Sequence, residues 1–216
     1  MATFNNPTGL AISPDGLVLF VAEHDSNMVR KILLATGTVT TLAGNGAVAT
    51  ADGPATAASF AHPVQLGVSP DGRFLYVSQD NAGAPGNGAV RAVAVATGLV
   101  TTLADLPLND PYGVAVAPGG GSLFVADANN NLLRRVNTST GAVATLAGTG
   151  AAGYGDGPAG SAVFNGPRGL ALSRIVPCPA AARPPATPPS GPGSGPCELP
   201  GLAWSVRLSQ PGQSLP

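Results

Sequence analysis

Short apolar runs alternate with turn residues along most of this sequence. The clearest stretch lies between Pro111 and Gly148, where four such runs are separated by Ala117-Pro118-Gly119-Gly120, by an Asp- and Asn-rich segment, and by Thr140-Gly141. Apolar runs of about four to eight residues, bounded by Pro, Gly and Asn, predict β-strands joined by tight turns. This stretch therefore predicts one four-stranded antiparallel sheet.

The same order of runs and turns recurs along the chain. Its start, a Pro-x-x-apolar motif, occurs at steps of 56, 48 and 56 residues: Pro7, Pro63, Pro111 and Pro167. Full units cover about 7–44, 63–105 and 111–148, whereas the fourth, 167–173, stops after one run. A repeat of about 50 residues with four strands is typical of a propeller blade.

The first two runs of each unit are almost continuously apolar, as in Leu19–Ala22 and Leu123–Ala126. Such runs predict strands that are buried on both faces, whereas a sheet solvated on one face would alternate. The repeat alone would also fit a sandwich. Sheets stacked around an axis explain the burial and the repeat length better, so we predict a β-propeller.

The residues within the repeat resemble the NHL-repeat family. The resemblance rests on Pro-x-Gly-apolar, on Leu-Phe-Val-Ala followed by an acid with Asn four residues later, and on Arg-Arg/Lys-apolar. It also rests on a connector with Asp-Gly-Pro and Phe, which precedes both Pro63 and Pro167. The resemblance covers residues 4–173. It implies an all-β, open propeller of three four-stranded antiparallel blades plus one strand.

Blade two departs from the family pattern. Gln65 stands where the other units have glycine, Gln79 stands at the acid position, and an insert, Asn81–Gly88, lengthens the middle loop.

Three blades and one strand are too few to close a ring, since closed propellers use roughly four to eight blades. An open arc leaves two blade surfaces uncovered. Three explanations stay open: truncation of a larger propeller, completion by a partner chain, or self-association through the open blade edges. We favour truncation, which makes the chain a fragment, because the fourth unit changes abruptly into a different composition.

Residues 174–216 form a Pro/Gly-rich tail that we predict to be mostly disordered, because few of its residues can build a core. Cys178 and Cys197 flank its proline-rich part and are either bonded to each other or two free thiols. Leu202–Leu208 is the one tail segment that predicts a strand, which would pair with an exposed blade edge.

The composition excludes several classes of function. A net charge of −1 and a single lysine, Lys31, argue against nucleic acid or membrane as a partner. Gly148–Gly153 fits a dinucleotide-binding motif, but the Gly-Asp-Gly-Pro segment after it cannot open a helix. We therefore assign no cofactor, no metal ligand and no catalytic residue.

Because strand direction alternates within a blade, loops after the second and fourth strands share one face of the propeller. Short Pro-Asp-Gly and Ala-Thr-Gly turns occupy the opposite face, so the variable loops gather on the first, which we call the loop face. Variable loops on a rigid scaffold are where binding residues concentrate. We expect a protein or small-molecule ligand to bind these polar residues: Glu23, His24, Asp25, Asn27, His62, Gln65, Gln79, Asp80, Asp127, Asn129 and Asn131.

Some of these residues have a structural explanation as well. Carboxylates at strand ends, such as Glu23 and Asp127, commonly accept hydrogen bonds from turn N–H groups. The arginines of the third strands are expected to snorkel at blade surfaces: Arg30, Arg91, Arg134 and Arg135.

Two functions stay open. The leading hypothesis is a non-catalytic propeller scaffold that binds its ligand through the loop face. The alternative is a fragment of a six-bladed propeller hydrolase or lyase with a metal in the central channel. In that alternative the metal would lie near Glu23, His24, Asp127 or Gln65. The only histidines, His24 and His62, could also form a metal or acid–base site with Glu23 and Asp25, although they lack the spacing of metal ligands.

Overall fold

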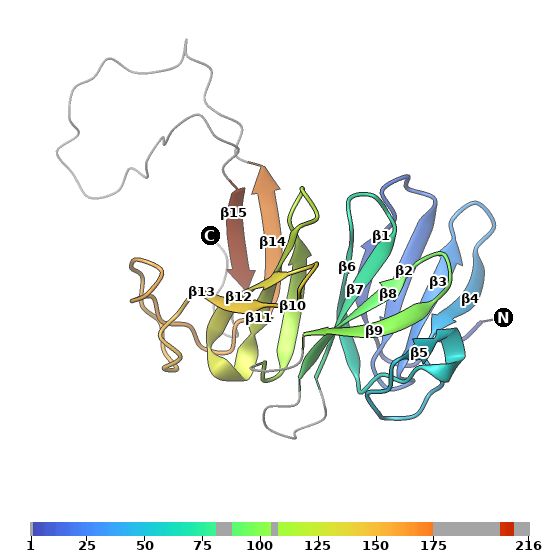
Figure 1. Cartoon of the computed structure of the whole chain (residues 1–216), viewed down its shortest axis with the longest axis horizontal. Coiled ribbons are helices and arrows are strands. Elements are labelled where there is room, and N and C mark those ends of the chain that lie inside the picture. The colour runs from blue at the N-terminus through green and yellow to red at the C-terminus, as the bar shows by residue number, and fades with distance from the viewer. Residues whose placement is uncertain (1, 81–87, 105–107, 175–203, 210–216) are drawn as a thin grey trace, which may run out of the picture.

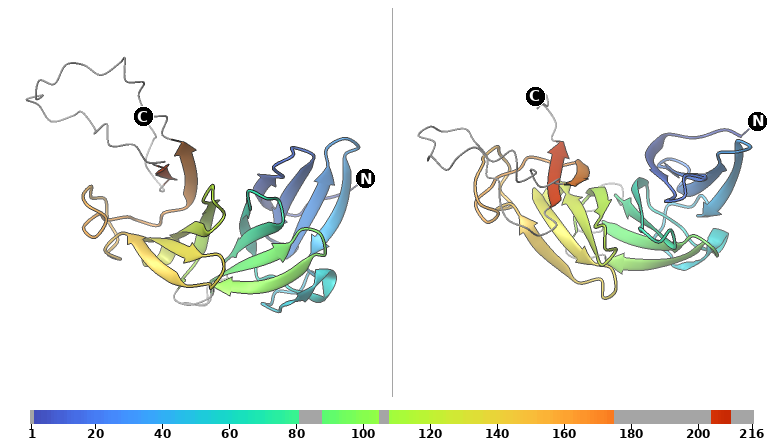
Figure 2. Two further views of the ribbon diagram at one scale, coloured as in Figure 1. Left: turned by 45° about the horizontal axis from the view of Figure 1, so that its top comes forward. Right: turned by 90° about the horizontal axis from the view of Figure 1, so that it is seen from above.

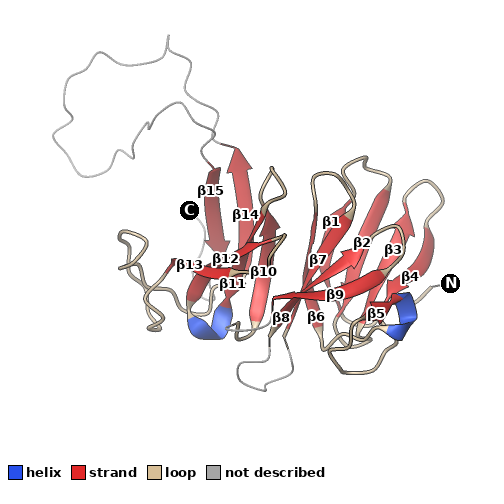
Figure 3. Cartoon of the chain, viewed as in Figure 1, coloured by secondary structure: helices blue, strands red, loops and turns tan. Residues whose placement is uncertain are grey.

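The structure, a computed structural model, describes residues 2–80, 88–104, 108–174 and 204–209. These residues form β-strands and two short 3-10 turns, η1 (Ala55–Ala57) and η2 (Ala128–Asn130) (Figure 3). No helix among them is long and apolar enough to cross a membrane. The predicted all-β class is confirmed.

Three antiparallel sheets follow each other along the chain (Figure 1), and in each sheet the four blade strands are paired in sequence order. Blade one contains β1 (Pro7–Ile12), β2 (Val18–Glu23), β3 (Met28–Leu33) and β4 (Thr38–Ala43). Blade two contains β6 (Pro63–Val68), β7 (Phe74–Gln79), β8 (Ala89–Ala94) and β9 (Leu99–Ala104), and the connector strand β5 (Gly53–Pro54) joins its outer edge. Blade three contains β10 (Pro111–Val116), β11 (Ser122–Asp127), β12 (Leu132–Asn137) and β13 (Val143–Ala147).

A fourth, two-stranded unit follows blade three. It pairs β14 (Gly169–Arg174) with β15 (Trp204–Ser209) in antiparallel register. The strand predicted at Leu202–Leu208 is therefore present, although it begins two residues later and ends one residue later than expected. Cys178, Cys197 and most of the Asn81–Gly88 insert lie outside the described residues, and the boundary between the repeats and a disordered tail stays a prediction.

The blades fan out with their first strands at the centre. β1 lies beside β6, β6 beside β10, and β10 beside β14. Figure 2 shows the resulting arc, with blade one at one end and β14 at the other. This arrangement confirms the predicted open propeller, because a sandwich would not bring successive first strands together.

Apolar side chains fill the two spaces between the blades. Leu75 and Val77 of β7 pack toward blade one, in a cluster with Phe20 and Val29. Tyr76, between them in sequence, belongs to the second cluster, which includes Leu123 of blade three. The continuously apolar second strand is thus explained by burial on both faces, as predicted.

Glycine allows the central strands to approach each other closely. A Cβ at Gly9 would lie 2.5 Å from the carbonyl oxygen of Val64, and a Cβ at Gly113 would lie 2.2 Å from that of Arg168. Both distances are shorter than any ordinary contact, so only glycine fits at these crossings without backbone movement.

The prediction for the third-strand arginines is wrong for three of the four. Arg91 is completely buried, and the side chains of Arg30 and Arg134 are only 16% and 12% exposed. Each points back along its blade to the residue at the acid position. Arg135 is exposed and donates from Nε to Ser122 Oγ at 3.0 Å.

Candidate functional site

The residue before the first proline of each unit adopts a left-handed backbone conformation. The φ angles are 49° at Asn6, 52° at His62, 55° at Asp110 and 56° at Gly166. Asn, Asp, His and Gly tolerate this region better than most residues. The carbonyl oxygens of Asn6 and His62 accept hydrogen bonds from the N–H groups of His24 (3.0 Å) and Asp80, respectively. The loop after each second strand is thereby held beside the start of a central strand.

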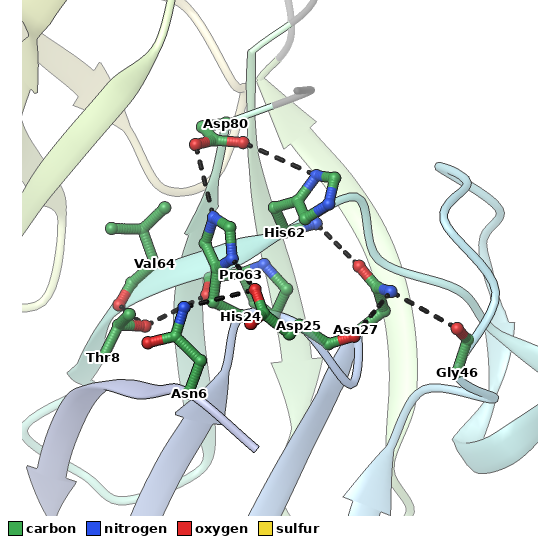
Figure 4. Close-up of polar contacts among 10 residues, drawn as sticks. All are labelled: Asn6, Thr8, His24, Asp25, Asn27, Gly46, His62, Pro63, Val64 and Asp80. Atoms are coloured by element: carbon green, nitrogen blue, oxygen red, sulfur yellow. Dashed lines mark hydrogen bonds and ion pairs between the residues drawn. The ribbon is translucent and has the colours of Figure 1, made fainter. Parts of the chain in front are cut away.

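Asn27 and Asn131 connect one blade to the next. Both have positive φ angles, 55° and 53°. Asn27 Oδ1 accepts the His62 N–H at 2.9 Å, while its Nδ2 donates to the Gly46 carbonyl oxygen at 3.3 Å (Figure 4). Asn131 repeats the arrangement with the N–H of Gly166, at 3.0 Å, one blade later. These two predicted binding residues therefore hold the long connectors in place.

The acid positions of blades one and three are buried and fully engaged. Glu23 accepts the Asn5 N–H and lies 3.2 Å from Arg30 Nη1. Asp127 accepts the N–H of Asn109 at 2.8 Å and the Arg134 Nε–H at 2.7 Å. The interpretation that these carboxylates satisfy turn N–H groups is confirmed, and their exposure, 1% and 0%, leaves little surface for a ligand.

Blade two replaces the acid with Gln79, because its arginine finds a carboxylate elsewhere. Arg91 Nη2 lies 2.6 Å from Asp52 Oδ1 in the preceding connector, and Arg91 Nη1 donates to Gln79 Oε1 at 3.1 Å. Burial of Asp52 opposes its ionisation, but hydrogen bonds from Thr102 and Arg91 outweigh burial and lower the pKa of Asp52. In blade two the carboxylate is therefore supplied by the preceding connector, while Gln79 accepts a hydrogen bond from the same guanidinium.

Four of the predicted residues gather at one place on the loop face (Figure 4). His24 Nδ1 lies 2.6 Å from Asp25 Oδ1, and His24 Nε2 lies 3.5 Å from Asp80 Oδ2. His62 Nδ1 lies 3.7 Å from the other Asp80 oxygen, and the two imidazole rings are 4.7 Å apart. Hydrogen bonds from His24 and Asn6 lower the pKa of Asp25. We call these four residues the histidine cluster.

A cavity of about 340 Å³ opens beside the histidine cluster, between the starts of the central strands. It is lined by Thr8, Val64, Gln65, Tyr112, Gly113, Arg168 and Gly169. We call this cavity the channel mouth. Its only charged lining residue is Arg168, whose guanidinium stands over the Tyr112 ring at 4.5 Å from the centroid.

Asp110 interacts electrostatically with one residue of each group, Asp80 of the histidine cluster and Arg168 of the channel mouth. Burial, assisted by the negative charge of Asp80, raises the pKa of Asp110, although Arg168 acts in the opposite direction. Its Oδ1 atom is buried and accepts no hydrogen bond from the described residues. The site therefore carries carboxylates and a guanidinium within one small region.

Several residues of this region were not predicted from the sequence. Four residues of the region are missing from the predicted binding residues, although each lies next to the proline that opens a unit: Asn6, Asp110, Tyr112 and Arg168. That fixed position is the signal that could have found them. Gln65, which was predicted, lines the channel mouth. Asn129 is exposed on η2 and belongs neither to the histidine cluster nor to the lining of the channel mouth.

Two further findings bear on the chemistry. A second cavity, of about 380 Å³, lies on the opposite face between the turns of blades two and three, and it includes Asp71 and Tyr76. Across the described ranges, no three His, Cys, Asp or Glu side chains are grouped so that they could hold a metal ion.

The fold and the central strands define this protein as an open β-propeller. Sequence similarity to known proteins identifies the family. The chain is 30% identical over 170 residues to NHL repeat-containing protein 2 of Bos taurus, which covers 67% of this chain. It is 26% identical over 192 residues, or 78% of its length, to protein SUPPRESSOR OF QUENCHING 1, chloroplastic, of Arabidopsis thaliana. The chain belongs to the NHL-repeat β-propeller family.

These relatives are much longer proteins. The chain spans 22% of the bovine protein and 18% of the plant protein. No family model matches the chain. Among solved structures, an auxiliary nutrient binding protein from Bacteroides thetaiotaomicron superposes with a TM-score of 0.57 at 16% identity, covering 75% of this chain and 42% of that one. Kuenenia stuttgartiensis hydrazine synthase gives 0.54 at 20% identity, with 78% and 39% covered. These likenesses support the fold alone.

Proposed function

We propose that this chain is a non-catalytic NHL propeller scaffold, that it forms part of a larger propeller ring, and that it binds a small polar ligand at the channel mouth. The repeated contacts of Asn27, Arg91 and Asp127 make the blades a rigid frame. A rigid frame with variable loops at one end suits display of a binding site. Buried residues such as Asn27, Arg91 and Asp127 hold the loops in place, and the exposed residues of those loops contact the ligand.

The observation that carries the proposal is the position of Arg168. Its guanidinium is held over Tyr112 at the rim of a 340 Å³ cavity, and within the described ranges no carboxylate forms an ion pair with it. Arginine binds carboxylates through two parallel hydrogen bonds, and a stacked guanidinium is already oriented for this. We infer that Arg168 anchors a ligand carboxylate.

The neighbouring charges define the other end of the ligand. Asp80 belongs to the histidine cluster, and burial together with the negative charge of Asp80 raises the pKa of Asp110. A positive group would be attracted there, because an opposite charge within a few ångströms stabilises carboxylates. A ligand with a carboxylate and an ammonium group, such as a free amino acid or a peptide terminus, matches both ends.

A thermal-shift titration with the common free amino acids tests this function. A ligand at about 100 times its Kd stabilises the folded state by about 2.7 kcal/mol. We expect at least one amino acid to raise the Tm of the wild type, and Arg168→Gln to abolish the response. Arg135→Gln is the matched control, because Arg135 is an exposed arginine outside the cavity. An equal response of Arg168→Gln and wild type would contradict the proposed site.

The non-catalytic part is tested separately. We expect the purified protein not to turn over ester or lactone substrates. Turnover that disappears in His24→Ala would support the hydrolase alternative instead, because His24 is a member of the histidine cluster with the general-base chemistry that such a reaction needs.

A further inference from the structure

Blade one presents an uncovered apolar face at one end of the arc. Leu10 and Ile12 of β1 are 58% and 56% exposed. Both lie on the same side of the strand, because side chains two residues apart share one face of a sheet. We call the side of blade one that carries Leu10 and Ile12 its open face.

The repeat shows what this face does elsewhere in the molecule. Leu10 is paired with Val21, just as Leu66 is paired with Val77 in blade two and Val114 with Val125 in blade three. Leu66 and Val114 occupy the position of Leu10, yet they are 4% and 5% exposed. Leu66 is buried against blade one, and Val114 against blade two. The open face is therefore the side by which a blade packs on the unit before it.

The two ends of the arc are complementary in the order of their elements. At the far end, β14 lies beside β10 in the same relation as β10 to β6 (Figure 2). β14 begins with Gly169, which stands at the repeat position of Gly9 and Gly113, the glycines that let a central strand approach the next one. The last unit thus provides a central strand of the kind that precedes a blade, and among the described residues no such strand lies before β1.

We propose that a second copy of this chain covers the open face, with its β14–β15 unit packed against β1. The same contact forms again between the second copy's blade one and the first copy's β14–β15 unit. A head-to-tail contact of this kind generates a closed ring if the rotation closes, and an open filament if it does not. Two arcs of three blades and a two-stranded unit stay within the roughly four to eight units of closed propellers. The second copy therefore completes both the ring and the channel.

This proposal rests on the part of the proposed function that makes the chain a segment of a larger ring, and it names a second copy as the rest of that ring. It does not depend on the identity or the binding of the ligand. It rests on the exposure of Leu10 and Ile12, whereas ligand binding rests on Arg168. A monomer that binds amino acids would refute only the second copy. A dimer without amino-acid binding would refute only the ligand.

Sedimentation equilibrium over a range of concentrations tests the second copy. We expect a mass of twice the 21.1 kDa of one chain, with no growth beyond it. The double variant Leu10→Asp/Ile12→Asp should weaken the dimer on the order of a hundredfold or more, because both side chains lose their burial. The milder Leu10→Ser should weaken it less and serves if the double variant fails to fold, as judged by circular dichroism.

Leu17→Asp is the matched control. Leu17 is 61% exposed but lies in the β1–β2 turn outside the strand, so this variant should dimerise like the wild type. A wild-type mass of one chain at about 100 μM, polymers that grow with concentration, or a folded double variant with unchanged dimer affinity would each overturn the proposal.

Discussion

Replacement of Arg91 by methionine should destabilise the protein more than any exposed substitution. Arg91 is fully buried in β8 and holds the connector against blade two. Its guanidinium donates to the carbonyl oxygens of Ser59 and Ala51, both at 3.0 Å, to Gln79 Oε1 at 3.1 Å, and to Asp52 Oδ1 at 2.6 Å. Methionine replaces the aliphatic part of the arginine side chain and removes every donor.

The magnitude follows from what is left behind. Breaking a buried ion pair by removing one partner costs about 3–5 kcal/mol, mostly because the other charge stays buried. The side chain of Asp52 is 50% exposed, so water screens its charge, and the free-energy cost of leaving Asp52 unpaired lies near the lower end of that range. The unpaired buried oxygens of Ser59 and Gln79 add to it, since each such group costs about 1–3 kcal/mol and the costs are not additive. We expect a loss of about 3–5 kcal/mol.

Urea unfolding, followed by circular dichroism, measures this loss as a lower midpoint with an unchanged slope. Arg135→Met is the control, because Arg135 is exposed, and it should change stability by less than about 0.5 kcal/mol. Asp52→Asn should also lower the midpoint, because it leaves the fully buried guanidinium of Arg91 without its carboxylate, although the Asn oxygen can still accept the hydrogen bond. A loss below about 1 kcal/mol in Arg91→Met would refute the view that this arginine fixes the connector.

Three further predictions concern the frame of the site. Asn27→Ala should lose about 2 kcal/mol and Asn27→Gly less, because glycine keeps the positive φ at low cost while both lose the bonds to the connector; urea midpoints measure both. Gly113→Ala should destabilise by about 2 kcal/mol or more in the same assay, whereas Gly119→Ala, with nothing near its added Cβ, should be nearly neutral. Asp110→Asn should raise the Tm at pH 7. Folding raises the pKa of Asp110, so above that folded pKa the ionised carboxylate destabilises the folded state, and the neutral Asn removes this cost. That gain should shrink as the pH falls through the folded pKa and vanish below the unfolded value of 3.8; a Tm that does not change at pH 7 would contradict it.

The repeat made most of the fold predictable. The blades share the same local signals: hairpin turns, a continuously apolar second strand and, in blades one and three, a Pro-x-Gly start. Because these signals recur from unit to unit, the strand assignment in one unit supported the assignment in the next. The direction of the loops followed from strand alternation alone. Sequence reasoning could therefore place His24, His62 and Asp80 on one face, although they come from two different blades.

Side-chain partners were less predictable, because they depend on packing between blades. Arg91 looks like a surface arginine in its strand, and only the connector that folds over it supplies Asp52 and excludes water. Arg168 follows a proline in a unit with one predicted strand, and only the neighbouring blade places Tyr112 beneath it. Both residues acquire their roles from segments distant in the sequence.

The most direct test of the central claim is a two-dimensional NMR titration of the protein with a free amino acid that raises its Tm. We predict backbone shifts confined to the channel mouth, at Thr8, Tyr112, Gly113 and Gly169, together with a shift of the Arg168 side chain. The opposite cavity, near Asp71 and Tyr76, should stay unchanged. Shifts centred on Asp71 and Tyr76, with none at the channel mouth, would contradict the account.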